Sequence, residues 1–356
     1  MFFVVILVLS LIPQATALFK VRGHLLLMIE NMIISVLFCV SELELTILWN
    51  KNEVIATMME YMKNDWLQPK TEQERDVMLS YGKATRILTI GGYLIIAVTI
   101  MFYHSPVFFG VALRTLSNLT DIGDRPFALQ SYYFFYPYNS PVYELVVLSQ
   151  LGICFVGTFC YTTVGTLFGA IVLHVSAQLE NLYNRMENMA KGDDAENFEI
   201  EFRTNMDEHE RLIRFSGMIE STFSLMLLGV IAGFTMMFCM QGYEIIEMLS
   251  DDIERPIIQI AVNIFYVIYA TYLMFGFSAV GQTLVTQSEK IQYATYNCEW
   301  YNRSAQEAAQ LIPVLVRSQR PLVITAGKFV SLNLAAFATL LKTTGGYISC
   351  LLAAKD

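Results

Sequence analysis

Seven apolar segments recur along the chain, separated by polar and charged stretches. They run approximately over residues 2–18, 25–49, 86–108, 143–174, 217–247, 257–285 and 329–352. A hydrocarbon layer about 30 Å thick is crossed by about 20 helical residues, so each segment is a candidate membrane span. The pattern predicts an all-α membrane protein with seven transmembrane helices. The first segment is short, and two other interpretations of it stay open: a signal peptide cleaved after Ala17, or a chain that begins inside its first helix.

Composition agrees with a membrane protein and argues against several other classes. The chain is 55% hydrophobic and 15% charged, whereas soluble domains carry about 25% charged residues. The net charge of −9 provides no basic face for nucleic acid. Neither the six cysteines nor the four histidines show metal-binding spacing, and no catalytic motif occurs. We therefore expect no enzyme, no metal site and no cofactor.

The distribution of basic residues predicts the orientation in the membrane. The segments between helices two and three, four and five, and six and seven hold sixteen of the 23 Lys and Arg residues. Basic residues concentrate in cytoplasmic loops, so the amino terminus is predicted inside and the carboxyl terminus outside. Asn118, in an Asn-Leu-Thr sequon between helices three and four, then lies on the outer side as a candidate glycosylation site.

The last apolar run has two different faces on a helical wheel. One half is apolar, and the other gathers mostly small and hydroxylated residues: Ser331, Ala335, Ala336, Ala338, Thr339, Lys342, Thr343, Gly345, Gly346, Ser349, Cys350 and Ala353. Such a face either packs tightly on a neighbouring helix or lines a water-filled pore. From the wheel alone, packing is the commoner explanation.

Two further stretches outside the spans have a recognisable pattern. The fourth helix continues past the membrane through residues 178–186, and 304–317 has a helical pattern, which together predict a cytoplasmic helical anchor domain. The outer loop 132–144 is dense in aromatic residues. It is either an ordered lid over the outer face of the bundle or an aromatic belt at the membrane interface.

The carboxyl-terminal part of the chain resembles the insect odorant receptor family. The specific matches are Tyr296, Cys298, Trp300, Tyr301, Gln319-Arg-Pro321, Ala326-Gly-Lys-Phe329, Phe337, Lys342-Thr343 and Tyr347. Weaker matches extend the resemblance over most of the chain: Asp65-Trp66, Tyr136-Pro137, Pro141-Val-Tyr-Glu144, Gln150, His174, Gln178-Leu179, His209 and Leu212. The chain departs from the family in two ways. We expect it to lack the family's cytoplasmic tail before the first helix, and Gly345-Gly346 stands where a larger residue and Ser are common.

The resemblance implies an odorant-gated, non-selective cation channel in the plasma membrane of olfactory dendrites. Such receptors form tetramers with a co-receptor subunit and bind small volatile molecules within the membrane. Residues 1–285 would form the ligand-binding bundle, 286–328 the anchor and linker, and 329–356 the pore helix and a short outer tail. The rival interpretations are a gustatory-type receptor channel, a seven-helix receptor that signals through G proteins, and a structural or transport membrane protein that binds no ligand.

Candidate site residues follow from the resemblance together with depth and helix face. For the odorant pocket these are Met32, Phe102, Tyr103, Phe155, Phe159, Tyr266 and Tyr269. For the pore and gate they are Ser349, Cys350, Ala353 and Ala354. For the subunit anchor they are Trp300, Tyr301 and Lys328. Tyrosine hydroxyls provide the few polar contacts expected in an apolar pocket, while Met and Phe provide adaptable apolar surface.

Overall fold

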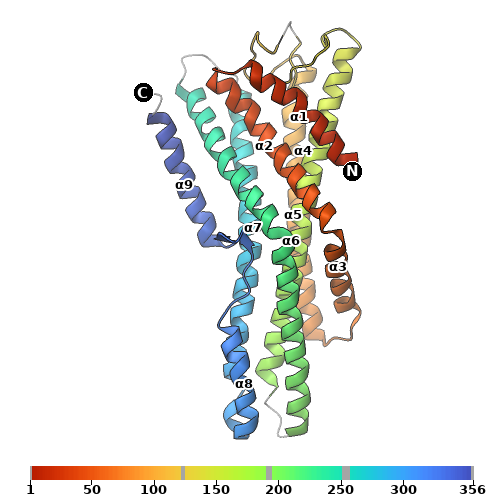
Figure 1. Ribbon diagram of the computed structural model, residues 1–356, viewed down its shortest axis with the longest axis vertical. Coiled ribbons are helices and arrows are strands. Elements are labelled where there is room, and N and C mark those ends of the chain that lie inside the picture. Colours follow the sequence, from red (N-terminus) through yellow and green to blue (C-terminus); the bar gives the residue numbers. More distant parts are fainter. Residues whose placement is uncertain (1, 122–124, 190–194, 251–256, 354–356) are drawn as a thin grey trace.

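The computed structural model describes residues 2–121, 125–189, 195–250 and 257–353, and it is an elongated bundle of long helices (Figure 1). The helices are α1 (Phe2–Lys20), α2 (Leu25–Asn50), α3 (Asn52–Leu67), α4 (Glu72–Phe108), α5 (Val142–Asn188), α6 (Ala195–Ser250), α7 (Ile257–Asn297), the 3₁₀ turn η1 (Trp300–Asn302), α8 (Ala305–Ser318) and α9 (Leu334–Ala353). Two short strands, β1 (Thr325–Ala326) and β2 (Val330–Ser331), pair antiparallel between α8 and α9.

Helices lie at all seven predicted ranges. Over the described residues, five of them are long and apolar enough to cross a membrane: α2, α4, α5, the Phe198–Glu247 part of α6, and α7 within the range Gln259–Asn302. Neither α1 nor α9 meets that measure over the described part of the chain. The fold class is thus confirmed as mostly helical with five candidate spans.

Several helices are much longer than a membrane is thick. The 47 residues of α5 and the 56 residues of α6 correspond to about 70 Å and about 84 Å of helix. Both run the length of the bundle and, with α7, reach the end that carries α8 (Figure 1). The predicted continuation of the fourth span is therefore confirmed, and a second helical region extends beyond the apolar part of the bundle.

The predicted helix before the last span forms α8, and its start has a clear local cause. Ser304 is the N-cap: its hydroxyl accepts from the Glu307 backbone N–H, while the Glu307 carboxylate accepts from the Ser304 backbone N–H. This reciprocal capping box satisfies two backbone donors that a helix otherwise leaves free.

The hairpin β1–β2 changes the start of the last helix. Gly327 and Lys328 both have positive φ, 60° and 65°, which turns the chain back on itself. The hairpin is held on α6, where the Glu220 carboxylate accepts from the Thr325 backbone N–H at 2.7 Å. The helix α9 consequently begins at Leu334, five residues later than the apolar run predicts.

The short helix α3 is attached to the bundle by a buried polar network. The Asp65 carboxylate lies 2.7 Å from His174 Nε2 on α5 and 2.7 Å from an Arg211 guanidinium nitrogen on α6. The Asp65 side chain is only 2% exposed. Three helices that are distant in sequence therefore meet at one charged group, which must be paired because burial of an isolated charge is costly.

Candidate functional site

A cavity lies between α2, α4, α5, α6 and α7, and we call it the inner cavity. Its lining consists of Ile34, Leu37, Phe38, Ser41, Ile96, Thr99, Ile100, Tyr103, His104, Leu129, Cys154, Gly157, Thr158, Tyr161, Phe234, Met237, Tyr266, Tyr269 and Leu273. The hydroxyls of Thr99 and Thr158 donate to carbonyls of their own helices, which leaves a mostly apolar surface. A lining of this kind is typical of a site for a small apolar molecule.

A second cavity lies beside the first, nearer the loop that joins α4 to α5, and we call it the outer chamber. Its lining consists of Gln14, Glu30, Asn31, Ile33, Ile34, Tyr103, Leu113, Arg114, Leu129, Gln130, Gln241, Glu244, Asn263 and Tyr266. This lining is far more polar than that of the inner cavity. Ile34, Tyr103, Leu129 and Tyr266 contribute to both linings.

The α4–α5 loop forms the roof of these cavities, because its segment 126–131 is buried and Leu129 lines both of them. Each of five consecutive carbonyls in this roof segment accepts a hydrogen bond from a side chain. The donors to residues 126 to 130, in order, are Tyr143, Arg114, Tyr103, Gln150 and Asn31. Buried carbonyls need such partners. Because the donors come from α2, α4, α5 and the loop itself, the roof is fixed to three helices at this end of the bundle.

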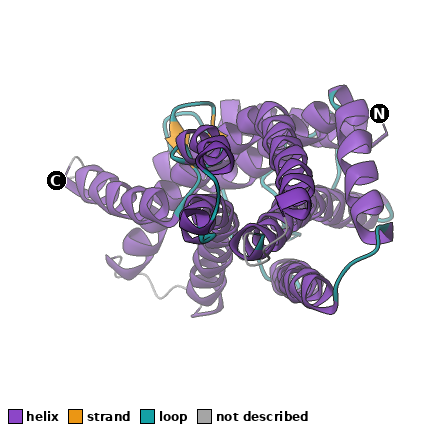
Figure 2. Ribbon diagram, turned by 90° about the horizontal axis from the view of Figure 1, so that it is seen from below, coloured by secondary structure: helices purple, strands orange, loops and turns teal. Residues whose placement is uncertain are grey.

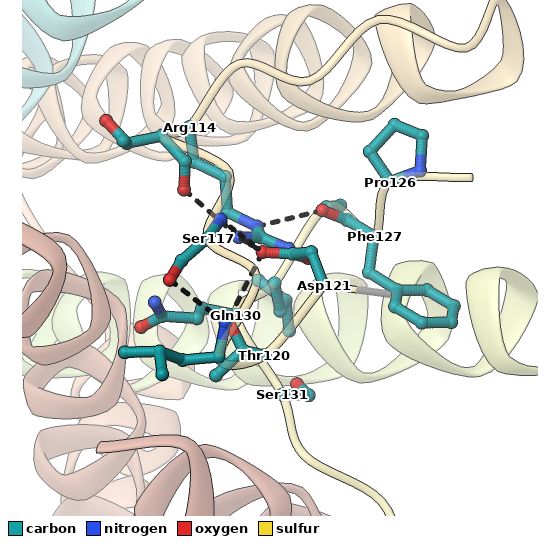
Figure 3. Close-up of polar contacts among 12 residues, drawn as sticks. Arg114, Ser117, Thr120, Asp121, Pro126, Phe127, Gln130 and Ser131 are labelled. Carbon is teal, nitrogen blue, oxygen red and sulfur yellow. Dashed lines mark hydrogen bonds and ion pairs between the residues drawn. The ribbon is translucent and has the colours of Figure 1, made fainter. Parts of the chain in front are cut away.

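Arg114 organises the rest of this loop, as Figure 3 shows. Its guanidinium donates to the Phe127 carbonyl at 3.0 Å and forms an ion pair with Asp121, with both side chains of the pair buried. The Asp121 carboxylate also accepts from the Ser117 backbone N–H at 3.0 Å. The ordered roof 126–131 comes just before the aromatic stretch 132–144, for which a lid and an aromatic belt were both left open. Within that stretch Phe134, Phe135 and Tyr136 are exposed, so both interpretations stay open.

The structure brings together three of the seven residues predicted for the pocket. Tyr103, Tyr266 and Tyr269 line the inner cavity. The rings of Tyr103 and Tyr266 meet edge to face, with centroids 5.9 Å apart. Their role in binding a ligand stays a prediction, but their position fits it.

The other four residues predicted for the pocket lie outside the inner cavity. Phe102 lines a neighbouring hollow with Tyr266. Phe155 and Phe159 are exposed on α5 and stack on each other, with centroids 6.0 Å apart. Met32 is half-buried and lines neither cavity. One residue is about 100° of helix rotation, so neighbours of cavity residues point elsewhere.

Sequence reasoning missed the α2 and roof contributions to the cavity. Ile34, Leu37 and Phe38 have the i, i+3, i+4 spacing of one helix face, and this spacing is the signal that could have identified them. Leu129 follows Phe127 and Ala128 as a short apolar run within a polar loop. Such a run predicts burial, although not the cavity under which it is buried.

The apolar face of α9 packs on its own chain in part, while Leu334, Leu341 and Tyr347 on the same face are exposed. Phe337 packs edge to face on Phe275 of α7, with centroids 5.9 Å apart, and Ile348 lies against Gly242 of α6. The small-residue face is mostly exposed in the single chain: Ala335, Ala338, Thr339, Lys342, Thr343, Gly345, Gly346 and Ser349. Figure 2 shows α9 projecting from one side of the bundle. The small face therefore does not pack on the helices of its own chain.

The remaining predicted residues lie as follows. Ser349 is exposed on α9, and Cys350 and Ala353 belong to this helix but their side chains, with all of Ala354, fall outside the described residues. Trp300 and Tyr301 form η1 with their rings in edge contact, and Lys328 is exposed in the hairpin turn. Asn118 is exposed in the α4–α5 loop, as its predicted glycosylation requires.

Solved structures share this fold. The structure of the insect olfactory receptor OR5 from Machilis hrabei superposes with a TM-score of 0.85 over 99% of this chain and 87% of that chain, at 13% identity. The structure of the same receptor in complex with eugenol gives a TM-score of 0.82 over 99% of this chain and 88% of that one, also at 13% identity. At such low identity the likeness concerns the fold alone.

Curated relatives are similar in sequence over part of their length. Odorant receptor 13a of Drosophila melanogaster is 25% identical over 69% of this chain and 60% of its own length. Odorant receptor 10 of Aedes albopictus is 23% identical over 60% of this chain and 56% of its own length. The odorant receptor coreceptor of Aedes aegypti is 24% identical over 42% of this chain and 30% of its own length. The matches thus span less than two thirds of each of these relatives.

A family model describes nearly the whole bundle at once. The model of the 7tm odorant receptor family matches residues 24–345, from the start of α2 to the middle of α9. This range includes every helix that lines the inner cavity and the roof above it. With the shared fold, the match shows that the chain belongs to the insect odorant receptor family.

Proposed function

We propose that this protein is the odorant-binding subunit of a ligand-gated, non-selective cation channel. A small volatile molecule binds in the inner cavity and favours the open state of a central pore. The inner cavity is the observation that carries this proposal, because it lies among five helices, is mostly apolar and is roofed by an ordered loop. One of the matching structures, the olfactory receptor OR5, holds eugenol, a small molecule of the size class expected.

The exposed small-residue face of α9 supports a pore made by several subunits. A face that its own chain leaves uncovered is available either to water or to another subunit. In the proposed assembly, α9 lines a shared pore with its constriction near Cys350, Ala353 and Ala354. The region of η1, which contains Trp300 and Tyr301, and of α8 would hold the subunits together at the cytoplasmic end, with Lys328 in the hairpin that follows.

The proposed partner is the odorant co-receptor subunit, in a heterotetramer surrounded by lipid. Similarity to coreceptor sequences over 42% of this chain supports a shared way of assembling. The amino terminus would be cytoplasmic and the carboxyl terminus extracellular. The receptor would stand in the plasma membrane of olfactory dendrites, with Asn118 glycosylated on the outer side.

Gating follows from a difference in affinity. A ligand shifts the channel toward the open state only if it binds that state more tightly than the closed one. The aromatic pair Tyr103–Tyr266 joins α4 to α7 beside the inner cavity. A ligand that repositions these two rings would change how α7 sits against α4, which provides a route from binding to helix movement.

Expression with and without a co-receptor, followed by calcium imaging against a panel of volatiles, tests the proposal. We expect ligand-evoked cation current only with the co-receptor, and it should persist when G proteins are inhibited. In Tyr269→Ala the midpoint of the dose–response curve should move, whereas Phe155→Ala, on the exposed side of α5, is the matched aromatic control. Equal potency in both variants would place the ligand outside the inner cavity.

A further inference from the structure

The outer chamber and the inner cavity share part of their lining. Tyr103 and Tyr266 stand there with Ile34 and Leu129. The Tyr103 hydroxyl donates to the Ala128 carbonyl at 2.9 Å, which holds this ring against the roof. A molecule longer than the inner cavity would extend past the tyrosine pair into the outer chamber.

Two buried carboxylates, Glu30 and Glu244, lie in the lining of the outer chamber. Glu30 already accepts from the Thr115 backbone N–H and hydroxyl, and Glu244 accepts from the Asn263 side-chain amide. Among the described lining residues the cation is Arg114, whose guanidinium already pairs with Asp121 and the Phe127 carbonyl. Carboxylate oxygens accept hydrogen bonds. The chamber is therefore suited to a group that donates hydrogen bonds and is unfavourable to an anion.

Gln130 provides independent evidence that the chamber takes a ligand group. Its side chain is 4% exposed and lines the chamber, yet within the described structure neither its amide oxygen nor its amide nitrogen has a hydrogen-bond partner. Its backbone carbonyl is fixed by the Asn31 side chain at 3.1 Å, so the residue is held at this place. A buried amide without partners is unfavourable, and a hydrogen-bonding guest would relieve it.

We propose that the outer chamber binds the hydrogen-bond-donating head, a hydroxyl or amino group, of an amphipathic ligand whose apolar body lies in the inner cavity. The inference rests on the proposed function and specifies its ligand class. The Gln130 amide oxygen accepts from the head group, and the charges of the two carboxylates favour a donor beside it. Carboxylic acids are disfavoured because their anions would face Glu30 and Glu244.

A ligand series tests this on the unmodified receptor, co-expressed with a co-receptor. The series shares one alkyl chain and ends in a primary alcohol, a primary amine, a methyl ether or a carboxylic acid. Since the ether lacks a donor, its half-maximal concentration should be roughly two- to tenfold higher than those of the alcohol and amine. The acid should be weaker still. Equal potency of ether, alcohol and amine overturns this inference but leaves the proposed function standing. A chamber filled by water would give that result. The absence of current with every volatile overturns the proposed function, and the inference with it.

Variants of Gln130 localise the effect. In Gln130→Met the alcohol and amine should lose roughly two- to tenfold in potency while the ether keeps its own. In Gln130→Glu, which preserves size and adds a carboxylate, the amine should gain relative to the alcohol. The control is Gln259→Met, which replaces a buried glutamine that lines neither cavity. Potency ratios are compared within each variant, so surface expression cancels. The assignment of the head group to this chamber is refuted by either of two results. One is an unchanged alcohol-to-ether potency ratio in Gln130→Met, and the other is an unchanged amine-to-alcohol potency ratio in Gln130→Glu.

Discussion

The Asp65 network predicts a large difference between buried and exposed ion pairs in the same protein. Asp65→Asn keeps the side chain's size but removes the charge that faces Arg211 at 2.7 Å. Removing one partner of a buried pair costs about 3–5 kcal/mol. Arg211 is 23% exposed and keeps Glu208 at 2.7 Å, so we expect about 3 kcal/mol, the lower end of that range. For a chain of this size the melting temperature should fall by on the order of 5 °C.

The matched control lies on α6, the helix that carries Arg211. Glu210→Gln removes an ion pair with Arg214 whose side chains are 67% and 62% exposed. Exposed pairs contribute about 0–1 kcal/mol, so this variant should melt close to the unmodified protein. Thermal unfolding of the detergent-purified receptor, followed by the loss of its monodisperse elution peak, compares the two. The double variant Asp65→Asn/Arg211→Met should lose less stability than the sum of the losses in the two single variants. Equal melting of Asp65→Asn and Glu210→Gln, or full additivity, would refute the reasoning.

The same network predicts a pH dependence. Burial raises the pKa of the Asp65 carboxyl, but the His174 hydrogen bond and the charge of Arg211 outweigh burial, so the pKa lies below its ordinary value. A lowered folded-state pKa contributes stability above the unfolded-state pKa, about 3.9 for Asp, and this is lost as the pH falls through the folded-state pKa. The difference in melting temperature between the unmodified receptor and Asp65→Asn should therefore persist from pH 7 to pH 5 and shrink only below about pH 4.

Three further predictions concern the hairpin and the outer loop. A Cβ on Gly281 would overlap the Leu332 carbonyl, whereas one on Gly276 of the same helix meets nothing within 4 Å. In Gly281→Ala, overpacking costs about 1–3 kcal/mol of stability, partly offset by the better helix propensity of Ala, so the melting temperature should fall. Gly276→Ala should preserve or raise the melting temperature. Glu220→Gln weakens the bonds that hold β1 on α6, so limited proteolysis should cleave the hairpin faster than in the unmodified receptor. Asn118→Gln should remove a glycosidase-sensitive band shift in insect cells; an unchanged band would mean that this exposed sequon is not used.

The long helices could be predicted from the sequence because apolar runs and capping residues are local signals. The range of α2 and the capping box of α8 at Ser304 and Glu307 both follow from neighbouring residues. The hairpin could not be predicted, since each strand is only two residues long and the apolar run continues through Phe329. What stabilises the hairpin is Glu220, more than 100 residues earlier, so no local pattern reveals it.

At the candidate site, the sequence predicts how deep a residue lies in the membrane but not toward which side of its helix the residue points. The membrane depth of a residue follows from its position in an apolar run, and Tyr266 and Tyr269 were placed by it. Rotation about the helix axis requires a contrast between polar and apolar faces. In the outer half of α5 both faces are apolar: Cys154 lines the inner cavity, while the next residue, Phe155, is 56% exposed. A membrane helix with lipid on one side and an apolar cavity on the other provides no such contrast.

The helix α7 joins the inner cavity to the start of α9, and in the proposed channel this connection predicts where ligand binding and pore opening can be uncoupled. Tyr269 lies at the cavity, and Gly281, twelve residues and about 18 Å farther along the helix, lies against Leu332 just before α9. Between them Phe275 packs on Phe337 of α9, with centroids 5.9 Å apart. Because a helix is stiff over this length, a shift of α7 at the cavity moves the base of α9 as well. Phe337→Ala removes the aromatic contact without touching the cavity, so maximal current per surface receptor should fall while the rank order of ligands stays the same. An unchanged maximal current in this variant would leave two explanations: α7 moves α9 through the Leu332 contact alone, or α7 does not move α9. Measuring the maximal current of Gly281→Ala in the same assay separates these two explanations.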